Sequence, residues 1–457
     1  MSLQELWRSA ESRHPTIRAG RESVSSARYT RDEQRWLALP SGDMSAYLSW
    51  SPDVKCLDAG DPNDTNVTPE QRSAKLSDGS FLFGGASRCT ATNSSFNLLQ
   101  DDIRKYLPIY GVLARVNINI TQPLFTFGKL STARALGNVG ITMAQAQADA
   151  GRGDLALNLV RAYFGIKAAR AALDTVKDGQ EQVVKWINQI DKELEAGKSG
   201  YTEIDLMRMK VAESQIELGV VDLERTLASA LAALRYLVQD SNADVDDGEL
   251  AVWASEEKEL NHYIESALVG RPEMRILNAT GDGARLYRKL RIAEFLPDFG
   301  ILVNFGYGVA TSVQDPANAF MNRFNFLGAG IGLGMRMNLD FGPKAARLQK
   351  AMADVRQYEE KRREALGGGA LEIERAYNDV VEARRRLAAA ETAEKRARGW
   401  LQGIRQAIDV GTAESRDMID ALRAYYDQHL MVLRTVNDLN VLAATLRRLS
   451  GLEIIPQ

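Results

Sequence analysis

The sequence predicts a membrane protein of mixed α and β structure, in which strands from several chains close a barrel and long helices form a coiled coil. Three observations predict this fold class. The two halves of the chain repeat each other, each half contains a long heptad seam, and each half contains alternating strands that no remaining segment could cover. The length of 457 residues would by itself fit either several domains or one elongated repeat protein.

An internal repeat organises the chain. At an offset of 257 residues Pro15 aligns with Pro272, and at an offset of 214 residues Phe127 aligns with Phe341. Further matches are Leu39-Pro40 with Leu296-Pro297, Arg161-Ala162-Tyr163 with Arg375-Ala376-Tyr377, Trp186 with Trp400, and Gly197 with Gly411. The sequence therefore divides into repeat 1, residues 1–258, and repeat 2, residues 259–457.

One long helix is expected in each repeat, at residues 128–197 and 342–410. Apolar residues recur there at alternating spacings of three and four, which is typical of a coiled-coil seam, and many of them are alanine. At 1.5 Å per residue each helix would run roughly 100 Å. The glycines at 151, 153 and 367–369 are expected to weaken or bend these helices.

The remaining helices are about half as long, so that two stacked helices equal one long helix. They are expected at residues 3–39, 202–238, 259–296 and 414–449. Between them, the polar segment 239–258 is expected to lie as an equatorial belt halfway along the rod.

A strand pair is expected in each repeat before the long helix. In repeat 1 the strands lie near residues 44–50 and at 110–121, joined by a long external loop at 52–108, and repeat 2 has its pair within 298–340, where only Leu302 breaks the alternation. Alternation alone also fits a soluble sheet with one wet face. The strands are nevertheless long enough to cross a bilayer, and four strands cannot close a barrel, so several chains must contribute.

Composition excludes several classes of protein. Charged residues make up 26% of the chain, the formal net charge is -3, and both signs are mixed along the sequence, so nucleic acid is not an expected partner. No run of about 18 apolar residues occurs, so any membrane span must be built from strands. The chain opens MSLQELW, without a basic and then apolar leader, and we expect that an export signal was removed.

The sequence predicts no cofactor, no metal site and no enzymatic activity. The three histidines, His14, His262 and His429, are scattered, and no nucleophile, base and orienting group occur together. Cys56 and Cys89 lie in a polar, loop-like stretch without metal-ligand spacing. We therefore predict that they form a disulfide in the external loop of repeat 1.

With Gln122-Pro123-Leu124-Phe125, Phe127-Gly128 and Arg161-Ala162-Tyr163 in these places, the whole chain resembles the TolC family of outer-membrane factors. The resemblance implies a homotrimer in which three chains supply twelve strands to one barrel and twelve helical columns to a tunnel. It also implies that the barrel lies in outer-membrane lipid and the helical part in the periplasm. A periplasmic adaptor protein and an inner-membrane transporter would be the partners.

The stretch Gly411–Ala421 resembles the family's tip motif, and Asp417 and Asp420 fall on its aspartate-ring positions. The resemblance predicts a periplasmic constriction formed by these two residues, with Asp205 and Glu414 adding to the negative charge. The alternative is that acidic residues simply favour the start of a helix after a turn.

Two departures from the family pattern concern the gate and the anchor. Ala413 and Ile408 stand where some members carry an arginine and a tyrosine that latch the gate, so that latch is not expected here. Some members are anchored through a lipid on an N-terminal cysteine. No cysteine precedes Cys56, so lipidation is not expected.

The leading functional interpretation is a passive exit duct for efflux or type I secretion, into which a partner pump delivers the substrate. The competing interpretation is a soluble coiled-coil scaffold or adaptor protein. The scaffold would explain the helical seams, but it would leave the four alternating strands without a role.

Overall fold

The computed structural model describes most of the chain. The described residues are 1–52, 54–58, 87–91, 109–196, 202–253, 258–311, 325–410, 412 and 415–455. They form two compact units, and each unit takes segments from both halves of the sequence. The helical unit comprises residues 1–31, 136–286 and 352–457, and the sheet unit comprises residues 32–135 and 287–351.

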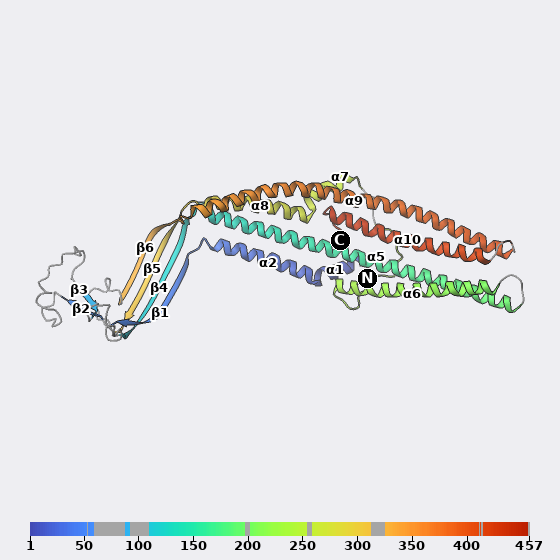
Figure 1. Cartoon of the computed structure of the whole chain (residues 1–457), viewed down its shortest axis with the longest axis horizontal. Coiled ribbons are helices and arrows are strands. Elements are labelled where there is room, and N and C mark those ends of the chain that lie inside the picture. Colours follow the sequence, from blue (N-terminus) through green and yellow to red (C-terminus); the bar gives the residue numbers. More distant parts are fainter. Residues whose placement is uncertain are drawn as a thin grey trace, which may run out of the picture. The chain divides into compact units, whose positions relative to one another are not determined.

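The two long helices occur at the expected places and run without interruption (Figure 1). They are α5, Lys129–Glu195, and α9, Phe341–Asp409. Each is followed by a shorter helix, α6 (Glu203–Val238) or α10 (Ser415–Leu449). Among the described residues, none of the helices is both long and apolar enough to cross a membrane.

The helices expected at 3–39 and 259–296 are each broken in two, which corrects the prediction. The observed helices are α1 (Leu3–Arg13), α2 (Pro15–Trp36), α7 (Leu260–Gly270) and α8 (Pro272–Ala293). The breaks fall at His14, with ψ 132°, and at Arg271, with ψ 121°. Each of these residues precedes a proline, whose ring disfavours the helical conformation in the residue before it. The matched prolines of the repeat therefore mark matched helix breaks.

The main sheet contains four antiparallel strands in the order β1-β4-β5-β6. The strands are β1 (Ser41–Pro52), β4 (Ile109–Phe125), β5 (Asp298–Ala310) and β6 (Phe326–Arg336). The strand pair expected within residues 298–340 thus ends at Arg336. A second, two-stranded sheet pairs β2 (Val54–Asp58) with β3 (Ser87–Ala91).

Register assigns one polar and one apolar face to the main sheet. Asp43 pairs with Asn119, Asn119 with Asn304, and Asn304 with Gly330, so this row lies on the polar face. Leu302 also lies on the polar face, where it covers a glycine of the next strand: a Cβ on Gly334 would lie 2.6 Å from Leu302 Cδ1. Because Gly334 has no side chain, there is space for Leu302 on the polar face, and the break in alternation is tolerated.

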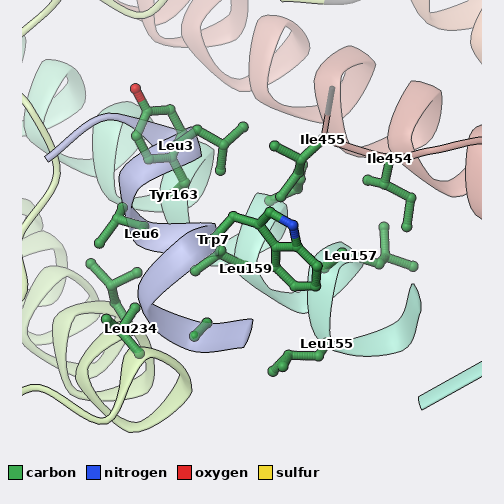
Figure 2. Close-up of a cluster of buried hydrophobic side chains, with 14 of the residues drawn as sticks. Leu3, Leu6, Trp7, Leu155, Leu157, Leu159, Tyr163, Leu234, Ile454 and Ile455 are labelled. Carbon is green, nitrogen blue, oxygen red and sulfur yellow. The ribbon is translucent and has the colours of Figure 1, made fainter. Parts of the chain in front are cut away.

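Three clusters of buried apolar side chains hold the helical unit together. One of them joins α1, α5 and α6 to the C-terminal segment (Figure 2), where Ile454 and Ile455 lie near Trp7 and Leu157. The second joins α7, α9 and α10. The third, which we call the tip core, joins the ends of α5 and α9 to the beginnings of α6 and α10.

Polar contacts fix the equatorial segment. Asn440, which is fully buried on α10, accepts a hydrogen bond from Trp253 N at 2.8 Å and donates one to Ala251 O at 3.0 Å. Nearer the start of this segment, Tyr163 donates to Asp246 at 2.6 Å, and Lys167 forms an ion pair with the same carboxylate at 3.0 Å. A buried amide with both groups paired is favourable, because an unpaired one would lose its hydration without compensation.

Another buried polar contact explains one of the glycines in α5. Arg448 is 8% exposed and bonds Asp154 on α5 at 2.9 Å and Glu273 on α8 at 2.7 Å. A Cβ on Gly153 would lie 2.7 Å from Arg448 Nε. The glycine therefore leaves the space in which the guanidinium crosses α5.

Candidate functional site

The apolar face of the main sheet is uncovered. Most of its large apolar side chains are exposed, for example Ile331 at 78% and Leu333 at 84%. The others are Met44, Leu48, Trp50, Val112, Ile120, Phe299, Phe305, Tyr307, Val309, Leu327 and Met335. A continuous apolar surface of this kind is unfavourable in water and favourable in hydrocarbon.

The two edges of the sheet are β1 and β6, the outer strands in the order of pairing. An edge strand presents one row of backbone N–H and C=O groups to the outside of the sheet. In lipid no water satisfies these groups, so a sheet with open edges cannot cross a membrane alone. A sheet of this kind placed in lipid would therefore require further strands on both sides.

The polar face carries two ordered rows of side chains. In one row, Asn304 Nδ2 donates to Asn119 Oδ1 at 2.9 Å, and Asn119 Nδ2 donates to Asp43 Oδ2 at 3.0 Å. In the other row the Arg115 guanidinium lies 5.9 Å from the ring centre of Tyr47 and 4.9 Å from that of Phe326. Both contacts are within the range of cation–π attraction.

Next to the tip core of the helical unit, Asp417 and Asp420 lie at the beginning of α10. Asp417 is in the first turn, and both side chains are exposed. Their neighbours Met418 and Ala421 are 3% and 0% exposed and belong to the tip core. A spacing of three places the two carboxylates close together on a helix surface. The two aspartates therefore face away from the core as a pair.

Asp205 begins α6 in a different way. Its Oδ2 accepts from Thr202 Oγ1 at 2.6 Å and from Thr202 N at 3.1 Å, while Asp205 N donates to Thr202 Oγ1 at 3.2 Å. The hydrogen bond from the Thr202 hydroxyl is the main cause that lowers the pKa of Asp205 below its ordinary value. The structure thus gives this carboxylate a capping role.

Ile408 packs against the tip core, together with residues of α10 such as Leu422 and Met418. An apolar side chain at this position contributes to packing and not to a polar latch. Glu414, Ala413 and Gly411, as well as residues 197–201, lie outside the described residues. The constriction as a whole remains a prediction.

Another polar link near the tip was not found from the sequence. Tyr426 on α10 donates to Asp178 on α5 at 2.6 Å. Its ring lies over Gly179, where a Cβ would be 3.3 Å from the ring. Burial, and then this hydrogen bond, raise the pKa of the Tyr426 hydroxyl, so it stays protonated and donates.

The cysteines lie on the small sheet, where the register of β2 and β3 places Cys56 directly opposite Cys89. This statement concerns the backbone only, because the side chains of these strands are outside the described part of the chain. The disulfide remains a prediction.

A four-stranded sheet with a bare apolar face, together with helices of 67 and 69 residues, defines a class of protein. It is the channel subunit whose strands enter a shared membrane barrel and whose long helices enter a tunnel. The sequence matches the family model described as outer membrane efflux protein over residues 113–238 and 263–452, which is more than half of the chain. The chain belongs to this family.

Similar proteins include the outer membrane protein TolC of Vibrio cholerae, which is 24% identical over 324 residues, 69% of this chain and 71% of that protein. Among solved structures, VceC of Vibrio cholerae has a TM-score of 0.72 at 14% identity and covers 99% of this chain and 97% of its own. CmeC, the outer membrane channel of Campylobacter jejuni, has a TM-score of 0.72 at 13% identity, with 98% and 85% covered. These structures share the fold of this chain.

Family membership decides between the two functional interpretations. The protein is an outer-membrane efflux channel subunit, with its helical part in the periplasm, and the soluble scaffold is set aside. The family is one of channel proteins and not of enzymes. The resemblance stated from the sequence is confirmed.

Proposed function

We propose that three copies of this chain form the exit duct of a tripartite efflux or type I secretion system. The observation that carries the proposal is the main sheet, with an uncovered apolar face and two edges that need further strands. Three chains would supply twelve strands, enough for a closed barrel with a lumen. The edges of each chain would then pair with those of its neighbours, and lipid would cover the apolar face.

Crosslinking of the full chain in mild detergent tests the trimer. We expect a three-chain species that persists at low protein concentration, because barrel closure pairs the strand edges. A membrane-inserted monomer that is stable under the same conditions would contradict the proposal.

Transport through this duct would be passive. A periplasmic adaptor and an inner-membrane transporter would deliver the substrate, and the duct would supply a water-filled path and a gate. Co-purification of the full chain from membranes under mild crosslinking should recover an adaptor. Recovery of an adaptor with a proton-driven transporter would favour efflux, and recovery with an ATP-driven exporter would favour secretion.

The gate would be formed by Asp417 and Asp420, which are exposed on one face of α10 and would recur in each copy. A ring of carboxylates concentrates cations and repels anions at a constriction. Replacing both residues with alanine should reduce cation selectivity in single-channel recordings and weaken block by multivalent cations. The matched control is Asp427→Ala, an exposed aspartate farther along α10. If the double variant keeps the original selectivity, both residues serve only the helix start.

The charge of Asp205 would reach this constriction only in part, because its carboxylate is already bonded to Thr202. Asp205→Asn should therefore lower stability more than it changes selectivity. Glu414 is proposed as a further contributor to the constriction on the family resemblance alone.

Cys56 and Cys89 would form a disulfide outside the cell, where conditions are oxidising. Their opposite positions on paired strands support this proposal. Mass analysis of protein recovered from the outer membrane, without reductant, should show a mass lower by two hydrogens. Two free thiols would contradict it.

A further inference from the structure

The polar face of the sheet is ordered in rows, and its charges are few. The row of Asp43 contains Asn119, Asn304 and Gly330, and the row of Arg115 contains Tyr47, Gly308 and Phe326. At the end of the sheet that continues into the helices, Asp298 and Arg336 pair across β5 and β6, and Lys129 bonds Asp298 at 2.8 Å. Charges of both signs therefore lie side by side at that end.

Asp43 and Arg115 occupy different rows and are held there by their neighbours. Asn119 fixes the Asp43 carboxylate, and Asn304 fixes Asn119. The two aromatic rings of its row hold the Arg115 guanidinium between β1 and β6. The two rows lie four positions apart along β1, which is about 13 Å.

Glycine makes room for the Arg115 row. Phe326 reaches across β5, where a Cβ on Gly306 would lie 2.8 Å from its ring. The guanidinium thus extends along the face of the sheet over a strand without a side chain at position 308. The arrangement orders a long and otherwise flexible side chain across the sheet.

We propose that the barrel lumen carries two charged girdles of opposite sign. Asp43 forms an anionic girdle toward the helices, and Arg115, held by Tyr47 and Phe326, forms a cationic girdle toward the outer mouth. This inference rests on the proposed trimer, in which the polar face lines the lumen and each row recurs three times. The outer girdle disfavours entry of cations from outside and favours anions, most strongly at low salt.

The distance over which each girdle acts on a solute is set by salt screening. The Debye length is about 8 Å at 0.15 M ionic strength and about 3 Å at 1 M. Solutes that pass near the wall therefore experience each girdle separately, because about 13 Å separates the rows. The two girdles therefore act weakly on small ions in the centre of the lumen and more strongly on bulky solutes that contact the wall.

Two serines of β1 provide matched reporters of the local potential. Ser49 lies two residues beyond Tyr47 on the same face, and Ser41 lies two residues before Asp43. In the full chain, Ser49→Cys and Ser41→Cys would each be labelled with a cationic and an anionic methanethiosulfonate reagent of similar size. The unsubstituted chain, with serine at both positions, measures the background labelling of Cys56 and Cys89.

We expect the ratio of anionic to cationic labelling rates to be about two- to threefold higher at Ser49→Cys than at Ser41→Cys at low salt, and the difference to shrink at 1 M. Adding Arg115→Gln should lower the ratio at position 49 and leave position 41 unchanged, whereas Arg115→Lys should retain it. Adding Asp43→Asn should raise the ratio at position 41 alone.

Equal ratios at the two positions, with the trimer intact by crosslinking, would overturn the girdles and leave the exit duct standing. A ratio at position 49 that does not respond to Arg115→Gln would also overturn the inference. Loss of the trimer in the serine-only chain would instead overturn the proposed function.

Discussion

The helical unit and the sheet unit differ in how their apolar side chains are buried. In the helical unit Leu6, Leu159 and Leu439 are completely buried within one chain, whereas in the sheet unit Ile331 and Leu333 are about four-fifths exposed. The first unit is stabilised by contacts within its own chain. In the proposed assembly, lipid and neighbouring strands would cover the second, so its stability would depend on assembly, and substitutions should act differently in the two units.

The largest expected effect comes from a charge on the apolar face of the sheet. Ile331→Arg should disfavour folding into lipid vesicles by about 2–4 kcal/mol, because a guanidinium near the bilayer midplane loses its hydration. Denaturant titration of vesicle-bound protein measures it. Ser45→Arg, on the polar face of β1, is the matched control and should cost far less. Equal costs for the two variants would show that the apolar face is not the lipid face.

Within the helical unit the largest expected effect is at Arg448. Arg448→Met removes charged hydrogen bonds to Asp154 and Glu273 and should lower the free energy of unfolding by about 2–3 kcal/mol. Arg447→Met is the matched control, since the neighbouring Arg447 is bonded to the carbonyl of Glu453 in an exposed position. A loss below that of the control would argue against the buried arrangement. Unfolding of the helical part, followed by circular dichroism in detergent, provides the measurement.

A smaller effect is expected at Tyr426, whose hydroxyl joins α10 to α5. Tyr426→Phe keeps the ring over Gly179 and removes the bond to Asp178, which should cost about 1 kcal/mol. Amide hydrogen exchange near the beginning of α10 should become faster. Tyr425→Phe serves as the control, because its hydroxyl accepts a longer contact, 3.4 Å, from Arg398. Unchanged exchange in Tyr426→Phe would show that the link does not restrain the helix.

The smallest expected effect is a pH dependence at His14. Burial lowers the pKa of this imidazole, and its Nδ1 accepts a hydrogen bond from Thr16 N at 3.2 Å. The unfolded chain therefore takes up the proton first, and the helical unit should lose stability, within about 1 kcal/mol, as the pH falls below about 6.5. His14→Gln should reduce the slope of stability against pH between 5 and 7. His262→Gln is the control. An equal slope of stability against pH in both variants would show that His14 is not the source of the pH dependence.

Much of the fold follows from periodicity, because a spacing of three and four or of two directly reports which face is apolar. The long helices at 129–195 and 341–409 and the main strands were predictable in this way. The breaks at His14 and Arg271 were missed because the helical period continues through them. The prolines that follow both residues were the available signal.

The tip and the polar face were predictable to different extents. The capping role of Asp205 has a local signal, since Thr202 stands three residues before it, as in a capping box. The contacts of Arg115 have no such signal. They depend on the register of four strands, which brings Tyr47 and Phe326 to the same row from distant parts of the sequence.

The anchoring of the equatorial segment has a practical consequence for labelling. Asn440 holds the backbone at residues 251 and 253, and Tyr163 and Lys167 hold Asp246. Between these anchors Gly248 and Glu249 are exposed. An epitope or a fluorophore-binding peptide inserted between these two residues would leave both anchors in place. The insertion would provide a handle for following the intact protein in living cells.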